Sequence, residues 1–135
     1  MKRSNRLALL LLSMLAPVGA ALAHGAPGPA LTTLMTKDLP DYPGKEMHVI
    51  TVDYPPGGSD PVHRHDAHVF VYVLEGAVVM GLGGGREVTL GKGQTFYEGP
   101  KDLHTVSRNA SSTEPARFLV VFFKNKGVDP VIPAR

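Results

Sequence analysis

The sequence contains no cysteine, which removes several kinds of site and crosslink at once. The chain can hold no disulfide, no thiolate metal ligand and no cysteine nucleophile, so its stability must come from core packing. Helical periodicity is also missing after the first 23 residues, since no later segment repeats apolar residues at helical spacing. The missing cysteine excludes thiol chemistry, and the missing helical periodicity favours an all-β fold.

An excess of charge of either sign is missing as well. The chain has 14 Lys and Arg against 12 Asp and Glu, and three of the basic residues, Lys2, Arg3 and Arg6, lie close to the N-terminus. The rest of the chain therefore carries 11 basic against 12 acidic residues. No basic patch is present, so the sequence offers no surface for nucleic acid.

Residues 1–23 have the three parts of an export signal. The basic residues come first, and an apolar run from Leu7 to Leu15 follows that is too short to span a bilayer. Ala21-Leu22-Ala23 then has the small-residue pattern of a cleavage site. We expect a periplasmic or secreted protein that leaves the membrane after signal cleavage. An uncleaved membrane anchor is the alternative.

The remaining sequence is a series of short apolar segments separated by Gly and Pro turns. The run Val69–Leu74 is apolar throughout and predicts a buried strand. Short strands at intervals of about 8–12 residues are typical of an all-β sandwich or barrel. We expect strands at residues 32–36, 46–54, 69–74, 77–82, 86–90, 94–97, 103–106 and 116–123.

The strand pattern predicts one folded domain at residues 45–124. A leader with an edge strand at residues 24–44 would precede it, and residues 125–135 would form a tail. Small β-sandwiches leave sheet edges that readily pair with a second copy across a two-fold axis. We therefore expect a homodimer, with the edge supplied by residues 32–36.

Two histidines, His63 and His65, precede the apolar run. Alternate residues of an extended strand point to the same face, so the two imidazoles project together. Because imidazole is a common ligand of Zn, Cu, Fe and Ni, this pair is half of a metal site. Histidines in a surface loop are the alternative interpretation.

From about Glu46 to Phe123 the sequence resembles the small single-domain type-2 cupins of bacteria. Two motifs carry the resemblance: Gly58-x-x-x-x-His63-x-His65 with Gly76, and Gly93 with Pro100 and His104. The resemblance implies a double-stranded β-helix, also called a jelly roll, with a metal inside the barrel. It implies that His63, His65 and His104 bind a divalent ion, which could be Fe, Mn, Ni, Zn or Cu.

One ligand that the resemblance implies is missing. A glutamate is usual, but its position falls on Val69, or on Phe70 in the alternative register. His68 and Glu98 are the candidates to replace it. In an unbroken strand, His68 would face away from the ligand pair unless a turn at residues 66–67 resets the alternation. Three neutral imidazoles alone would leave the full divalent charge and a stronger Lewis acid.

The resemblance implies, first, a metal-dependent dioxygenase of the quercetinase-like type. A small substrate would chelate the ion through deprotonated oxygens, with Glu98 or His68 as the base. The second possibility is a non-catalytic module that holds a metal or a small ligand for storage or sensing. A structural protein with a vestigial site is the third, although three unpaired histidines inside a barrel would be costly to keep.

Overall fold

The computed structural model describes residues 25–134, and the expected export signal at residues 1–23 lies outside them. Every regular element of the described part is a β-strand. Residues 25–134 accordingly contain no helix long and apolar enough to cross a membrane. The prediction of an all-β fold is confirmed.

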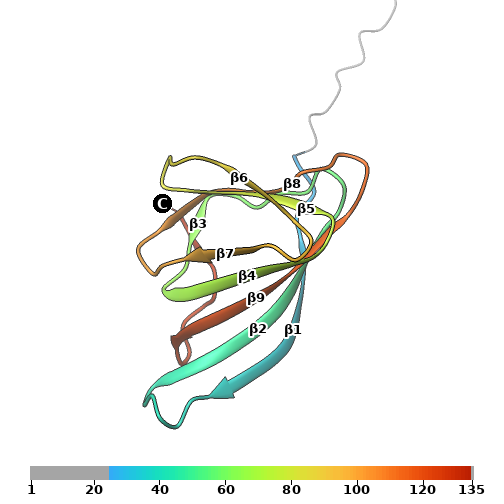
Figure 1. The fold of residues 1–135 in the computed structure, drawn as a ribbon. Coiled ribbons are helices and arrows are strands. Elements are labelled where there is room, and N and C mark those ends of the chain that lie inside the picture. Colours follow the sequence, from blue (N-terminus) through green and yellow to red (C-terminus); the bar gives the residue numbers. More distant parts are fainter. Residues whose placement is uncertain (1–24, 135) are drawn as a thin grey trace, which may run out of the picture.

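Within residues 25–134, ten strands form two five-stranded sheets in which every pair of neighbours is antiparallel. The sheet orders are β1-β2-β9-β4-β7 and β10-β3-β8-β5-β6, and Figure 1 shows them as the two layers of a jelly roll. All eight predicted strands are present, with bounds that differ by up to three residues. The strands are β1 (Ala30–Asp38), β2 (Lys45–Tyr54), β3 (His63–Arg64), β4 (Ala67–Glu75), β5 (Ala77–Leu82), β6 (Val88–Gly91), β7 (Thr95–Glu98), β8 (Leu103–Asn109), β9 (Ala116–Asn125) and β10 (Ile132–Pro133).

The core lies between the sheets, and β4 shows how the sequence builds it. Val69, Val71 and Val73 point inward and are buried, whereas Phe70 and Tyr72 point outward and are 52% and 45% exposed. The apolar run predicted a strand buried throughout, and only one of its faces is. The sequence does not show this alternation of buried and exposed positions, because both faces of the strand carry apolar residues.

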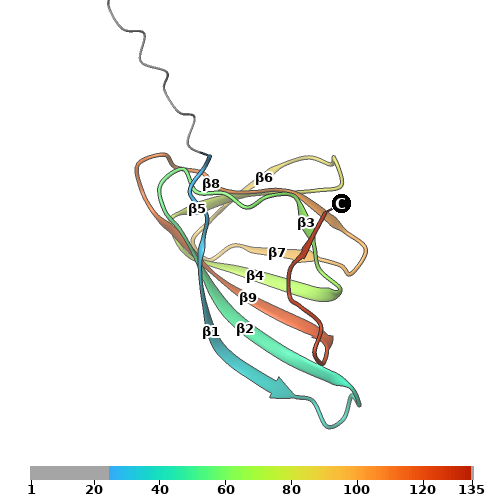
Figure 2. The same ribbon diagram turned by 180° about the vertical axis from the view of Figure 1, so that it is seen from behind.

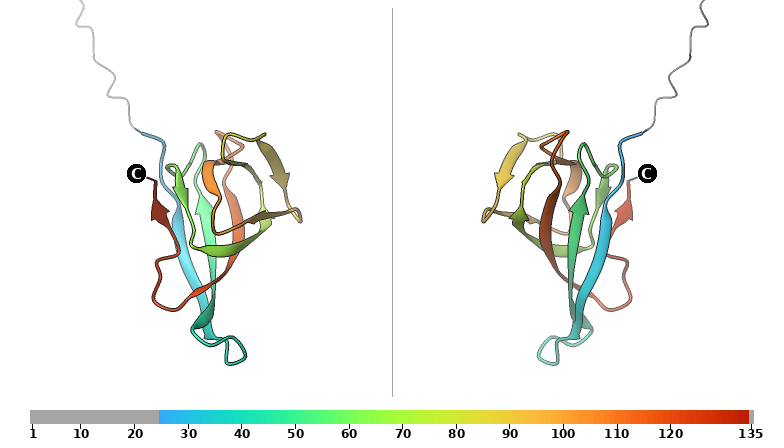
Figure 3. Two further views of the ribbon diagram at one scale, coloured as in Figure 1. Left: turned by 90° about the vertical axis from the view of Figure 1, so that its left-hand side faces the viewer. Right: turned by 90° about the vertical axis from the view of Figure 1, so that its right-hand side faces the viewer.

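The edge strand β1 is nine residues long, and every one of its residues is exposed. It pairs with β2 along one side only. The β1–β2 hairpin projects beyond the other sheet, β10-β3-β8-β5-β6, as Figure 1 and the side views of Figure 3 show. The prediction of an edge strand around residues 32–36 is confirmed.

The C-terminal segment differs from the predicted tail. After β9 the chain folds back, and β10 pairs with β3, so that Pro133 lies opposite His63. Figure 2 shows this last stretch, in red, running beside β3. The buried Lys124 holds the turn by donating from Nζ to the carbonyl of Val128 at 2.6 Å. Residues 128–134 therefore belong to the barrel and lie against the strand that carries the first histidine.

Candidate metal centre

Three histidines from two segments of the chain meet inside the barrel. His63 on β3 lies directly opposite His104 on β8, and His65 follows β3. All three are buried, and their ligand atoms lie within 4.8 Å of one another. The structure thus brings together the three residues that the two motifs predicted as metal ligands.

Backbone carbonyls orient two of the three rings. Nδ1 of His63 donates to the carbonyl of Pro61 at 2.8 Å, and Nδ1 of His65 donates to the carbonyl of Pro130. A ring that donates through Nδ1 keeps the lone pair of Nε2 for a metal. Burial lowers the pKa of His65 below its usual 6.5, which favours the neutral form that binds a cation.

The third ring, His104, lies against the carboxylate of Glu98. Oε2 of Glu98 is 3.1 Å from Nδ1 of His104 and 3.6 Å from Nε2 of His65. Glu98 is only 2% exposed, although it stands at the end of β7. The structure therefore places the predicted Glu98 at the histidine cluster.

Three buried atoms at this cluster have no hydrogen-bond partner: Oε2 of Glu98 and both ring nitrogens of His104. They are the only such side-chain atoms in the described part of the chain. Buried polar groups are nearly always paired, because an orphaned one costs about 1–3 kcal/mol. Imidazole nitrogens and carboxylate oxygens suit Zn, Fe, Mn, Ni and Cu alike. The residues therefore fit a divalent metal ion, and they do not select among these elements.

His68 does not join the cluster. Its side chain is exposed on the outer face of β4, where Nδ1 is hydrogen bonded to the hydroxyl of Tyr97 at 2.7 Å. The bend before β4 leaves the alternation intact, since His65, Ala67 and Val69 are all buried. The structure corrects our expectation of His68 as a base or ligand, because its odd offset from His65 turns it outward.

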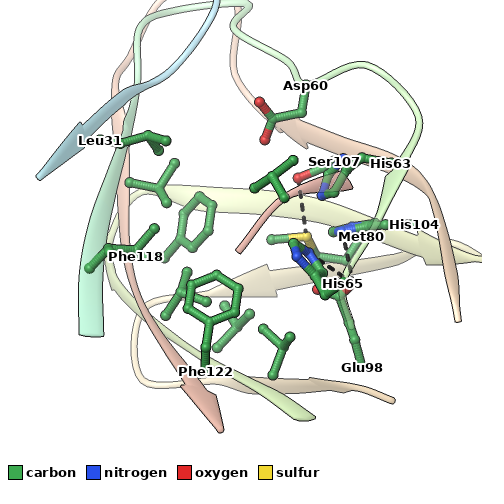
Figure 4. Close-up of a pocket in the computed structure, with 16 residues that line it drawn as sticks. Leu31, Asp60, His63, His65, Met80, Glu98, His104, Ser107, Phe118 and Phe122 are labelled. Carbon is green, nitrogen blue, oxygen red and sulfur yellow. Dashed lines mark hydrogen bonds and ion pairs between the residues drawn. The ribbon is translucent and has the colours of Figure 1, made fainter. Parts of the chain in front are cut away.

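A cavity of about 180 Å³ adjoins the three histidines. Figure 4 shows the histidines and Glu98 on one side of it and two phenylalanines on the other. Apart from the three histidines and Glu98, the only polar side chains among its lining residues are Asp60 and Ser107. The apolar lining consists of Leu31, Ile50, Val52, Val69, Val71, Met80, Phe118, Val120, Phe122 and Val131.

Sequence reasoning missed two further polar residues that line this cavity, Asp60 and Ser107. The buried hydroxyl of Tyr54 donates to Oδ2 of Asp60 at 2.5 Å and lies 2.6 Å from Oγ of Ser107. Burial, helped by the Asp60 carboxylate, raises the pKa of Tyr54 well above its usual 10.0. The one available signal was position, because Asp60 and Ser107 each lie three residues from a motif histidine.

The model of the cupin domain matches residues 50–122. No curated protein matches the sequence.

Among the solved structures, TT1209 of Thermus thermophilus is 27% identical, with a TM-score of 0.57 over 70% of this chain and 82% of that one. The polyketide cyclase RemF of Streptomyces resistomycificus is also 27% identical, with a TM-score of 0.58 over 82% of this chain and 75% of that one. A double-stranded β-helix protein of Klebsiella pneumoniae is 17% identical, with a TM-score of 0.63 over 90% and 99%, and this likeness shows the fold alone.

Proposed function

The chain belongs to the cupin family, and from that premise we propose that it is an exported, metal-dependent dioxygenase acting on a small chelating organic substrate. One observation carries the proposal. Three buried imidazoles converge beside a cavity with mainly apolar walls, and the unpartnered atoms of His104 and Glu98 lie at the same point. When bound there, a divalent metal would supply Lewis-acid and redox chemistry to a substrate held in the cavity.

The size of the cavity limits the substrate. An apolar cavity of about 150 Å³ accepts one benzene molecule, and the cavity here measures about 180 Å³. A single ring with neighbouring oxygen atoms, or a short diketone, fits this space, whereas a three-ring flavonol does not. We therefore propose a substrate smaller than those of quercetinases. The similarity to a polyketide cyclase supports a substrate with several oxygen atoms.

Two sets of polar groups in the cavity lining would orient such a molecule. The oxygens that chelate would face the histidines, and a further hydroxyl would donate to the carboxylate of Asp60. Tyr54 holds that carboxylate by its own hydrogen bond. Asp60 is also a carboxylate that can take a proton from the substrate if Glu98 is engaged by the metal. The apolar walls would exclude water from the rest of the cavity.

Metal content and oxygen consumption test the proposal together. The chain from residue 24 onward is purified, stripped of metal and reloaded separately with Fe(II), Mn(II), Ni(II), Zn(II) and Cu(II). One ion per chain is expected, with oxygen uptake on addition of acetylacetone or catechol for at least one redox-active metal. An ion without oxygen uptake would leave the other function considered, a module that stores or senses a metal or small ligand. A chain that binds none of the five ions would overturn the dioxygenase and the metal-storing module alike.

Two histidine variants make this experiment specific. His104→Ala removes a residue with two unpartnered ring nitrogens at the centre and is expected to lose the ion. His68→Ala removes an exposed ring from the outer face and is the matched control, with unchanged metal content. Equal metal content in the two variants would show that the ion binds elsewhere.

We also propose that two copies of the chain pair through β1. Its outer edge has no partner strand within residues 25–134, and Leu31, Leu34 and Met35 on it are 57%, 55% and 45% exposed. An exposed apolar edge strand readily pairs with another chain. Light scattering should give the mass of a dimer, and Leu34→Lys should shift it toward the monomer. A monomeric wild-type protein would contradict the pairing.

A further inference from the structure

The position that lacks the usual glutamate has a carboxylate directly across from it. Val69 on β4 and Glu98 on β7 are opposite each other in the antiparallel register. Opposite residues of neighbouring strands point to the same face, with Cβ atoms about 4.5–5.5 Å apart. Both are buried, and both line the cavity beside the histidines. A glutamate at either position can therefore reach the same region of the barrel.

The contacts of Glu98 have the spacing of metal ligands. Ligand atoms that bind one ion at about 2.0–2.2 Å are separated from each other by roughly 2.8–3.6 Å, depending on the coordination geometry. Oε2 of Glu98 lies 3.1 Å from Nδ1 of His104 and 3.6 Å from Nε2 of His65. The contact with His104 is not a hydrogen bond, since both atoms lack a partner. An ion between these atoms explains their closeness better than a direct bond does.

The burial of Glu98 gives an energetic reason for a bound ion at this position. Glu98 is 2% exposed, and the only basic side chains near its carboxylate within the described residues are the two histidines, which are charged only when protonated. A buried carboxylate is costly unless it is paired or binds a metal. A divalent cation among the histidines would offset that cost and give Oε2 the partner that it lacks.

We propose that Glu98 on β7 is the fourth metal ligand. It takes the place of the glutamate that is usual at the β4 position where this chain has Val69. The proposal rests on the metal site of the proposed function. It changes the electrostatics of that site, because three neutral imidazoles and one carboxylate leave a net charge of +1 on a divalent ion. The ion is then a weaker Lewis acid than with three histidines alone.

A swap of the carboxylate between the two strands tests the proposal. Glu98→Gln is expected to weaken Co(II) and Zn(II) binding at least 100-fold in chelator competition and to change the visible spectrum of the Co(II) form. Glu98→Val should do the same. The double variant Glu98→Val with Val69→Glu returns a carboxylate to the cavity from β4, and its affinity should recover to within about tenfold of wild type. Glu75→Gln, at an exposed position of β4, is the matched control.

Folding is followed by urea unfolding of each metal-free variant. Metal-free Glu98→Gln should be at least as stable as wild type, because the buried oxygen that it replaces has no hydrogen-bond partner. If Glu98→Gln binds Co(II) within threefold of wild type and gives the same spectrum, Glu98 is not a ligand. If wild type itself binds no ion, the proposed metal function fails instead, so the two failures are distinct.

Discussion

The carbonyl oxygen of Pro130 accepts a hydrogen bond from Nδ1 of His65, which lies 65 residues earlier in the chain. The bond fixes the plane of the ring and leaves Nε2 facing the cluster. Pro130 is held there because β10 pairs with β3, the strand that also carries His63. The C-terminal segment is thus part of the support of the metal centre.

Deletion of residues 129–135 should weaken metal binding without unfolding the barrel. The deletion removes the carbonyl that orients His65 but keeps Val128, whose carbonyl accepts from Lys124. Loss of a group that orients a ligand typically costs about 10–100-fold in metal affinity. Chelator competition with Zn(II) measures the loss, and Asp129→Asn, an exposed change in the same segment, is the control. Wild-type Zn(II) affinity in the deletion variant would show that the carbonyl of Pro130 does not orient His65 for metal binding.

The buried Tyr54 should make stability fall at alkaline pH. Its pKa is raised in the folded protein by burial and by Asp60, so the folded state keeps a proton that the unfolded state releases above pH 10.0. Stability from this group is fully present below that pH and is lost as the pH rises, by about 1.4 kcal/mol per pH unit.

Tyr54→Phe should therefore lose less stability than wild type between pH 10 and 11 in urea unfolding. The variant should also be less stable at pH 8 by about 1–3 kcal/mol, since Asp60 and Ser107 lose a buried partner. Absorbance near 295 nm gives a second measurement. Because Tyr54 stays protonated in the folded protein, the tyrosinate signal of folded Tyr54→Phe near pH 10 should match that of wild type. A clearly smaller signal in the variant than in wild type would contradict the burial argument.

The sequence predicted the parts of the centre that depend on local pattern. His63 and His65 face the same way because they are two residues apart, and that holds whatever the rest of the fold does. Glu98 could be named only as a candidate. Its position beside the histidines depends on β7 pairing with β4 rather than with β6, which precedes it in the chain. Pairing between distant strands leaves no local signal, and neither does the return of Pro130 to His65.

The outer face of β4 shows the opposite case, in which a local pattern was misleading. An unbroken apolar run predicted a buried strand, but sheet-on-sheet packing covers only one of its faces. The bend before the strand offered a way for His68 to turn inward. The alternation through Ala67 and Val69 shows that it does not.

Gly76, which joins β4 to β5, should not tolerate a side chain. Its φ is +68°, and a Cβ there would lie 2.5 Å from the carbonyl oxygen of Pro115. Gly76→Ala should cost more than the roughly 1–2 kcal/mol of a left-handed alanine. Gly44→Ala is the matched control, because Gly44 has a φ of +77° and open space around it. Urea unfolding should show Gly76→Ala as the more destabilised variant, and equal losses would contradict the predicted clash.

Val120→Phe should close the cavity while leaving the metal in place. Val120 is buried on β9, a strand that supplies none of the three histidines, and its side chain lines the cavity. A ring in this space should reduce the affinity of the Zn(II)-loaded protein for catechol at least tenfold, with unchanged Zn(II) content. The overpacking should cost about 1–3 kcal/mol of stability.

Val121→Phe is the matched control, because the next residue along β9 adds the same ring on the outer face of the sheet. Calorimetric titration with catechol should distinguish the two variants. If Val120→Phe bound catechol as wild type does, small ligands would have to reach the metal by another surface, and the limit that the cavity sets on substrate size would no longer hold. If both variants lost catechol equally, the loss would come from strain in β9 and not from the filled cavity.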